Sequence, residues 1–517
     1  MLRKGILGIG TVFVVVAMLL ATSIHAENTA TVPRKTIVIT PSETLITGDS
    51  LVAGSELDEK KPVIETDKNG NLLVAYTLER GVFDTDILIS TSTNGGETWN
   101  SVTPPWGEEL EGRQDNAELC FDPNVNVLLG TFADEAYPAL MIFKVDDVSD
   151  LGTYEYNGWG GPDELVDAGI TYTTLEDGTE LIVTMGTGSV SPFESTCVWG
   201  YMSVDPFEFY GGYYYYDAQS VIGEYTDARE IKGFTFGERT YGFIFYALVG
   251  ETGKYGIGIK WTLYENEPDL EYVANQFWLE DGSGDYHVIA PDVATSGNSI
   301  YVVYCTDENI YGNYGVYMKY TTDGGQTWNR VTVVDDPTAD DLYPAIYAAG
   351  NTLYVVYVKS GNLYLVKSTD GGQTWSEPEQ VNEVDGTVSM EEHTADICSR
   401  GIVWVDTRNG NKDIYFAPLP APIITIGISG GFGVKATISN EGTEAAENLA
   451  WSVDLSGAVF IGKHAEGTID TLNPGESVTV GPGLVFGIGP TTITVNAGGV
   501  TKTAKGFVLG PLVLGVS

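Results

Sequence analysis

Three stretches of this sequence share one pattern: Ser92-Thr93-Asn94-Gly95-Gly96-Glu97-Thr98-Trp99, Thr321-Thr322-Asp323-Gly324-Gly325-Gln326-Thr327-Trp328 and Ser368-Thr369-Asp370-Gly371-Gly372-Gln373-Thr374-Trp375. A hydroxyl residue is followed two positions later by Asn or Asp, four later by Gly and seven later by Trp. The Asx side chain and the hydroxyl can bond the backbone of a tight turn, Gly accepts a positive φ, and Trp can pack between neighbouring sheets. The pattern predicts three equivalent turns, built on Ser92, Asn94, Gly96 and Trp99; Thr321, Asp323, Gly325 and Trp328; and Ser368, Asp370, Gly372 and Trp375.

A longer unit repeats around these turns. Turns rich in Gly, Asn and Asp return every 50 to 61 residues from residue 69 to residue 400, and each precedes an apolar strand such as 300–304 or 353–357. Short strands joined by Gly-containing hairpins indicate antiparallel β-structure, and this period is typical of four-stranded propeller blades. We therefore expect an all-β chain with a seven-bladed β-propeller over residues 35–417, a six-bladed one being the alternative.

The seventh repeat has only three expected strands. After the strand at 413–416 comes Pro418-Leu419-Pro420-Ala421-Pro422, a stiff linker over 418–422. The early segment Thr36–Thr40 is expected to supply the missing outer strand, which would remove two exposed sheet edges.

Composition bounds the function. The 517 residues carry 71 acidic and 26 basic side chains, a net charge of −45. A nucleic-acid ligand is therefore excluded, because its binding needs clusters of Lys and Arg. Such acidity favours neutral or basic partners, or cations.

The N-terminus reads as a secretory signal peptide over residues 1–26. Arg3 and Lys4 precede an apolar run over 6–21, and Ala26 offers a small residue at the cleavage site. An uncleaved membrane anchor is the alternative. We expect an exported protein, extracellular or at the cell surface, with no transmembrane segment after cleavage.

The four cysteines, Cys120, Cys197, Cys305 and Cys398, form no CxxC pair. Buried free thiols are favoured, although Cys120 and Cys197 fall in neighbouring repeats and could pair. No cofactor is expected and no metal ligand set is identified. Weak Ca²⁺ binding by so acidic a chain stays open.

The three stretches resemble the Asp-box, or bacterial neuraminidase repeat, of the sialidase superfamily, with Asn94 replacing Asp in the first copy. The resemblance implies a propeller whose boxes stabilise turns remote from the substrate. At the family's Arg-x-Pro position this chain has Lys60-Lys61-Pro62, and a lysine does not reproduce the bidentate fork of arginine. Arg80 with Asp84 or Asp86 is placed like the family's acid/base loop, so the resemblance implies one of these carboxylates as the acid/base if the protein is an enzyme.

A propeller function is expected at the channel mouth, where the inner strands of all blades begin. Polar residues precede or open those strands in nearly every repeat. The candidate binding residues are Lys60, Lys61, Arg80, Arg113, Asp115, Asp167, Asp227, Arg229, His287, Asp341, Tyr343 and His393. The alternative is that these residues are polar only because the loops before the strands are exposed to solvent.

Residues 423–517 have fewer aromatic residues and short alternating strands. Their turns Asn440-Glu441-Gly442-Thr443 and Leu472-Asn473-Pro474-Gly475-Glu476-Ser477 resemble those of CARDB-like and other immunoglobulin-like modules. About 95 residues suit such a β-sandwich.

These observations favour an exported propeller that binds a glycan or a cell-surface protein and lacks sialidase activity. The alternatives are an exo-acting, sialidase-like glycoside hydrolase with an altered carboxylate-binding pocket, and a structural envelope protein. The sequence leaves the ligand and the oligomeric state open.

Overall fold

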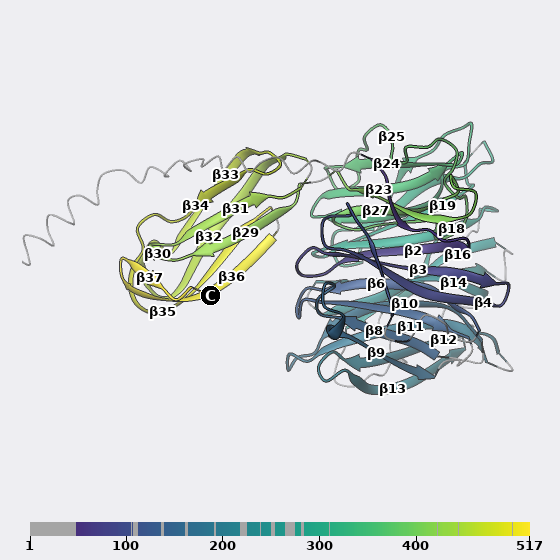
Figure 1. Ribbon diagram of the computed structural model, residues 1–517, viewed down its shortest axis with the longest axis horizontal. Coiled ribbons are helices and arrows are strands. Elements are labelled where there is room, and N and C mark those ends of the chain that lie inside the picture. Colours follow the sequence, from purple (N-terminus) through teal and green to yellow (C-terminus); the bar gives the residue numbers. More distant parts are fainter. Residues whose placement is uncertain are drawn as a thin grey trace, which may run out of the picture. The chain divides into compact units, whose positions relative to one another are not determined.

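The computed structural model describes residues 48–104, 106, 112–135, 139–160, 164–190, 193–217, 225–237, 239–249, 254–263, 275–280, 284–309, 311–420, 422–442, 444–498 and 500–516. These residues form strands and one short 3-10 turn, η1 (Leu151–Thr153), and no α-helix is found among them. They divide into two compact units, the second of which begins at Ile424 (Figure 1).

The described part of the first unit contains seven four-stranded antiparallel sheets. Six of them are made of four consecutive strands each. In chain order they are β2 (Asp58–Thr66), β3 (Leu72–Gly81), β4 (Asp84–Ser92), β5 (Asn100–Val102); β6 (Gln114–Asp122), β7 (Val127–Asp134), β8 (Ala139–Val145), β9 (Tyr154–Gly160); β10 (Glu164–Thr174), β11 (Glu180–Val190), β12 (Phe193–Ser203), β13 (Glu208–Asp217); β14 (Tyr225–Phe236), β15 (Thr240–Val249), β16 (Lys254–Leu263), β17 (Asn275–Glu280); β18 (Val288–Ser296), β19 (Ser299–Thr306), β20 (Gly315–Thr321), β21 (Asn329–Val334); β22 (Leu342–Ala349), β23 (Thr352–Lys359), β24 (Asn362–Ser368), β25 (Glu379–Gln380). The seventh sheet has the order β1 (Ser50–Ala53), β28 (Asp413–Pro418), β27 (Gly401–Asp406), β26 (Ala395–Ile397).

The first strands of successive sheets lie against one another around a cycle. Contacts run from β2 to β6, β10, β14, β18, β22 and β26, and from β26 back to β2. The second strand of each sheet is covered on both faces, as in β19, where every residue after the first is buried. Continuous apolar runs such as Ile300–Tyr304 are therefore required in the second strands. The cycle of four-stranded sheets gives the first unit a β-propeller fold.

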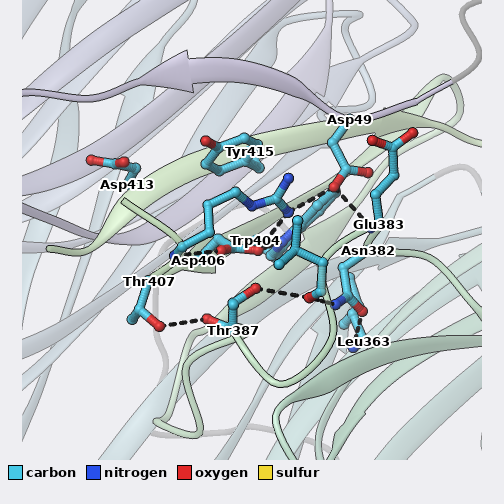
Figure 2. Close-up of polar contacts among 12 residues, drawn as sticks. Asp49, Leu363, Asn382, Glu383, Thr387, Trp404, Asp406, Thr407, Asp413 and Tyr415 are labelled. Atoms are coloured by element: carbon cyan, nitrogen blue, oxygen red, sulfur yellow. Dashed lines mark hydrogen bonds and ion pairs between the residues drawn. The ribbon is translucent and has the colours of Figure 1, made fainter. Parts of the chain in front are cut away.

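The seventh sheet joins the two ends of the first unit. Asp49, just before β1, accepts hydrogen bonds from the Glu383 amide (3.0 Å) and from Arg408 Nη2 (2.7 Å). Arg408 Nη2 also bonds Asp406 Oδ2 (2.6 Å), and its guanidinium lies 3.9 Å from the centre of the Tyr415 ring. Figure 2 shows Asp49, Asp406 and Tyr415 gathered at this join. A buried charged cluster thus fixes the segment before β1 to the last sheet.

The fourth strand of this sheet is β1, at residues 50–53, and not Thr36–Thr40 as the sequence suggested. Thr36–Thr40 and the expected signal peptide lie outside the described residues. In the expected linker, Leu419 is buried in the core of the last sheets, beside Trp404 and Tyr415. Leu419 thus belongs to the first unit.

Three cysteines, Cys120, Cys305 and Cys398, are free thiols. Cys305 and Cys398 are buried and Cys120 is partly buried. The side chain of Cys197 lies outside the description.

The second unit contains two sheets around one hydrophobic core. The smaller has the order β29 (Ile424–Ser429), β31 (Lys435–Asn440), β34 (Ser477–Val480). The larger has the order β30 (Gly431–Phe432), β37 (Leu512–Leu514), β36 (Val500–Gly510), β35 (Phe486–Ala497), β32 (Ala446–Ile461), β33 (His464–Leu472). Alternate residues such as Ile493 and Val495 point into this core, as the period of two in a β-strand requires.

Candidate functional site

The candidate site lies where the first strands of the sheets begin. In six of them, β2, β6, β10, β14, β18 and β22, the pairing register shifts within the strand's first half. In all of these but β10, a shifted segment contains a left-handed non-glycine residue, with φ between 48° and 52°, and His393 (φ 56°) stands just before β26. These residues are Lys61, Asn116, Glu230, Ala290, Tyr343 and His393. A bulge re-aims a side chain, so a bulge with a left-handed residue recurs around the mouth in five sheets, and the seventh sheet has the left-handed residue alone.

Lys61 joins the first two sheets. Its Nζ donates hydrogen bonds to Asp115 Oδ2 (2.7 Å) and Asn116 Oδ1 (2.7 Å). Arg113 lies 3.4 Å from Asp115 Oδ2 and 3.3 Å from Glu135 Oε1. Burial acts to raise the pKa of Asp115, but the charges of Lys61 and Arg113 and the hydrogen bonds from Lys61 outweigh it, and the pKa is lowered.

A cavity of about 30 Å³ opens between the fourth, fifth, sixth and seventh sheets, large enough for one or two water molecules. Glu230, Lys232, Tyr343 and His393 are among its lining residues. Glu230 is 4% exposed, and its Oε1 lies 3.5 Å from His393 Nε2 without a hydrogen-bond partner among the described residues. The Glu230 carboxyl group is therefore available at the mouth to form a hydrogen bond with a ligand.

The electrostatic environment favours the neutral form of both members of this pair. Burial, aided by the nearby Glu392, raises the pKa of Glu230 well above its usual range. Burial, aided by the charges of Lys232 and Lys61, lowers the pKa of His393 well below its usual range. A protonated carboxyl group beside a neutral imidazole can both donate and accept hydrogen bonds.

Lys232 is the central cation of the channel and forms an ion pair with Glu118 from the second sheet. Burial alone would lower the pKa of Lys232. The negative charges of Glu118, Asp292 and Asp396 raise it by more than burial lowers it, so the net shift of the pKa is upward. Burial raises the pKa of Glu118 to about 8 and that of Asp396 to about 6, although Lys232 acts against both shifts. Asp167, also buried, has its pKa raised to about 6 by desolvation. The positive charge of one buried lysine thus acts on several buried carboxyl groups, whose pKa values are nevertheless raised.

Two of these carboxylates also tie neighbouring sheets together. Asp396 Oδ2 accepts from the Ile64 amide at 2.8 Å, and Asp292 Oδ2 from the Ile346 amide at 2.7 Å. Both bonds join first strands of adjacent sheets. The channel residues therefore have a structural role as well as an electrostatic one.

Sequence reasoning did not single out Glu118, Lys232, Asp292 or Asp396. A charged residue in the middle of a strand reads as part of a solvated face when one strand is considered alone. The available signal was their spacing: Glu118, Lys232 and Asp292 each stand two residues after a left-handed position.

Other candidates lie farther from this cavity. Lys60 pairs with Glu79 on the neighbouring strand. His287 accepts from the Tyr255 amide at 3.4 Å, and its own amide donates to Asp307. The side chains of Asp227 and Arg229 lie outside the description.

Asp341 belongs to a separate acidic loop. It is fully buried, and its Oδ2 accepts from the Asp336 amide at 3.0 Å. Lys359 pairs with Asp336 and lies 3.9 Å from Asp341. Burial raises the pKa of Asp341 to about 6. The negative charge of this loop is therefore balanced in part by Lys359.

The two candidate acids of the first sheet differ. Asp86 is 3% exposed and forms an ion pair with Arg80. Asp84 is exposed at the hairpin between β3 and β4, next to Val82 and Phe83. Only Asp84 therefore presents its carboxylate to solvent.

The three repeated turns that resemble Asp-boxes, called the boxes below, lie at the opposite ends of the sheets. Each box joins the third and fourth strands, and in an antiparallel sheet that turn is remote from the start of the first strand. The same bonds recur: the Gly372 amide donates to Ser368 Oγ (2.8 Å), and the Thr374 amide to Asp370 Oδ1 (2.9 Å). The equivalent bonds in the other boxes join Gly96 to Ser92, Thr98 to Asn94, Gly325 to Thr321 and Thr327 to Asp323.

Two further findings bound the chemistry. In the ranges described above, no group of three or more His, Cys, Asp or Glu side chains is arranged to hold a metal ion. Within those same ranges, no helix has the length and apolar character needed to cross a bilayer.

The first unit is thus a β-propeller with a polar, partly buried mouth. No protein-family model and no curated protein matches the chain. Among solved structures, the polysaccharide lyase Uly1 aligns at 13% identity over 72% of this chain and 93% of its own, with a TM-score of 0.42. The β-propeller domain of the Trilobed protease from Pyrococcus furiosus aligns at 11% identity, over 69% of this chain and 95% of its own, with a TM-score of 0.37. The Trypanosoma rangeli sialidase in complex with sialic acid aligns at 10% identity over 92% of both chains, with a TM-score of 0.36. At these values the likeness concerns the fold, and the function has to be argued from the site.

Proposed function

We propose that the chain is an exported binding protein: a closed seven-bladed Asp-box propeller, followed by an immunoglobulin-like sandwich, that binds a glycan at the channel mouth. The observation that carries the proposal is the repeated left-handed residue at the mouth. A non-glycine residue in this conformation costs on the order of 1–3 kcal/mol, and such strain concentrates at ligand clamps. Six sheets keep it in the same place.

The side chains presented by these residues suit sugar hydroxyl groups. They include an ammonium, an amide, a carboxyl, a phenol and an imidazole, on Lys61, Asn116, Glu230, Tyr343 and His393. A hydroxyl group both donates and accepts, and this set offers both functions. The Tyr343 ring adds an apolar face of the kind on which a sugar ring stacks.

The charge distribution favours a neutral glycan over a sialic acid. Arg80 is engaged by Asp86, and Arg113 by Asp115 and Glu135. Arg239, Arg330 and Arg408 are each engaged by a different acidic residue, namely Glu176, Glu308 and Asp49. A sugar carboxylate would have to compete with these carboxylates for each cation.

The test is binding of the purified chain to a glycan array, followed by calorimetry with Tyr343→Ala. Ala290 occupies the equivalent left-handed position in the fifth sheet, so alanine is tolerated there. We expect the variant to weaken binding of the array hit at least about tenfold, which is about 1.4 kcal/mol. Tyr311→Ala is the matched control, because Tyr311 is 55% exposed in the loop before β20.

Equal binding by both variants, or no glycan bound by the wild type, would refute the proposed site. A fluorogenic glycoside panel separates binding from hydrolysis. Turnover that is lost in Asp84→Ala would replace this proposal with the glycoside hydrolase alternative.

A further inference from the structure

The outer face of the larger sheet in the second unit is apolar over half of its area. Along β36 and β37, Val508 and Val513 point into the core, while Phe507, Leu509 and Leu512 point the other way. The same alternation holds in β35, where Ile493 is buried and Ile488 is 63% exposed. These strands are thus apolar on both faces, where a sheet facing water would normally be polar on one.

The register places the exposed apolar side chains side by side. Leu512 is directly opposite both Phe432 on β30 and Leu509 on β36, and Leu509 is opposite Ile488 on β35. A second row runs from Leu514 through Phe507 to Pro490. Directly opposed residues of antiparallel strands share one face. With Phe460 and Phe486 at its border, this set is named the apolar patch: Phe432, Phe460, Phe486, Ile488, Pro490, Phe507, Leu509, Leu512 and Leu514.

The apolar patch is large and strongly exposed. Phe432 is 70% exposed and Phe460 66%. Nine half-exposed side chains present on the order of 700 Å², since an aromatic side chain alone has roughly 150–250 Å². The largest patch of a typical monomer is about 300–600 Å². A standard interface needs about 800 Å² from each partner, which the patch and its rim can supply.

The charge pattern isolates this surface. Residues 424–517 carry four lysines and seven acidic residues, a net charge of −3 in a chain of −45. All seven acidic residues fall within 441–454 and 464–476, and Asp454, on the same strand as Phe460, pairs with Thr494, four residues beyond the last patch residue of β35. The nearest charge on the same face of β36 is Lys505, two residues before Phe507. A second copy of the patch would therefore meet the first without opposing carboxylates.

We propose that two copies of the chain pair through their apolar patches, sheet face to sheet face, as an isologous dimer. A flat, pleated face of Phe, Leu and Ile side chains is complementary to a second such face about 10 Å away. A bilayer is the less suitable occupant, because membrane-surface patches carry Trp and Tyr. The nine patch residues include neither.

Sedimentation equilibrium of the full chain between about 0.1 and 100 µM in 0.5 M NaCl tests the dimer; high salt screens the acidic propellers. We expect a mass twice the 55.7 kDa of the chain. Leu509→Glu buries one carboxylate from each copy in the apolar interface and should weaken dimerisation at least about 30-fold, the ~2 kcal/mol of a hot spot. Leu509→Ser, which adds no charge, should weaken it less.

Thr503→Glu is the matched control, because Thr503 is exposed on the same strand and the same face but in its polar half. It should change the dissociation constant less than about threefold. A wild-type chain that stays monomeric at 100 µM would overturn the proposal, as would equal effects of Leu509→Glu and Thr503→Glu. A monomer that floats with phosphatidylcholine–phosphatidylglycerol vesicles would identify a bilayer as the occupant instead.

Discussion

The two ends of the propeller sheets are stabilised in different ways. At the Asp-box end, the side chains that close a turn bond groups only two to four residues away, as Asp323 does with Gln326 and Thr327. At the mouth, Lys232 bonds Glu118, 114 residues earlier, and Ile64 bonds Asp396, 332 residues later. The box end is determined by local sequence, and the mouth exists only once the sheets have assembled.

The largest expected effect is the loss of the central cation of the mouth. Above pH 8, where the Glu118 carboxyl group with its pKa of about 8 is ionised, Lys232→Met leaves this carboxylate buried without its counter-charge, at a cost of about 3–5 kcal/mol. Urea unfolding followed by tryptophan fluorescence measures the change in the free energy of unfolding.

Lys232→Met combined with Glu118→Gln is the control. Removing both charges should recover part of the loss, because the pair is then replaced by neutral groups. A single Lys232→Met substitution that costs less than about 1 kcal/mol would show that the mouth does not depend on this ion pair.

The contrast also explains what could be predicted from the sequence. The boxes and the turn period led to the propeller because each box is a local hydrogen-bonding unit. The fourth strand of the seventh sheet was placed at Thr36–Thr40, where a Thr-Ile-Val-Ile-Thr run has high β-propensity. The strand at Ser50–Ala53 is selected by tertiary contacts instead: Ser50 Oγ donates to the Gly96 carbonyl and accepts from Trp99 Nε1.

The mouth shows the same limit. Polar residues at strand starts pointed to Lys61, Asp115, Tyr343 and His393, which the structure places around the mouth. Lys232 and its carboxylate neighbours were missed, because their relation depends on how seven sheets come together. Local patterns identify the rim, and assembly determines the interior.

A smaller effect is expected at the box end, where two adjacent glycines form a matched pair. A Cβ at Gly372 (φ 88°) would lie 2.2 Å from Met318 Cε of the preceding sheet, whereas Gly371 (φ 75°) has its nearest such atom at 3.9 Å. Gly371→Ala should cost about 1 kcal/mol from backbone strain alone. Gly372→Ala should cost roughly a further 0.5–1.5 kcal/mol, because the flexible end of the Met318 side chain has to move aside.

Thermal unfolding of both variants measures the difference. Equal melting temperatures would mean that the box turn does not pack tightly on its neighbour. Glycan binding should be unchanged in both variants, because the boxes are remote from the mouth.

The pH dependence of stability probes the mouth carboxyl groups. The pKa of Glu118 is about 8 in the folded protein, above its ordinary value, so the folded state holds a proton that the unfolded state has released. Stability is therefore lost as the pH rises through that value. The lowered pKa of His393 acts only below its ordinary value of 6.5, since above it the imidazole is neutral in both states.

Between pH 6.5 and 8.5 we expect the melting temperature to fall by about 2–4 °C. Glu118 faces Lys232, which stays charged, and Asp167 and Asp396, which have largely lost their protons by pH 7. Glu118→Gln should flatten the slope. An unchanged slope in this variant would assign the effect to the general charge of −45 or to Glu65 and Asp122, two other buried carboxyl groups with pKa values of about 7.

The smallest expected effect concerns the one box that lacks its aspartate. Asn94 Oδ1 accepts from the Thr98 amide at 3.1 Å, and its Nδ2 donates to Thr98 Oγ1 at 3.0 Å. In the other boxes a carboxylate accepts both bonds, at 2.9 and 2.6 Å in the third. Asn94→Asp should therefore raise the free energy of unfolding by a few tenths of a kcal/mol, approximately, because a charged acceptor forms the stronger bond. The reverse change, Asp370→Asn, should lower the free energy of unfolding, and urea unfolding measures both changes. If both changes destabilise, Asn94 is adapted to its own sheet and the three boxes are not interchangeable.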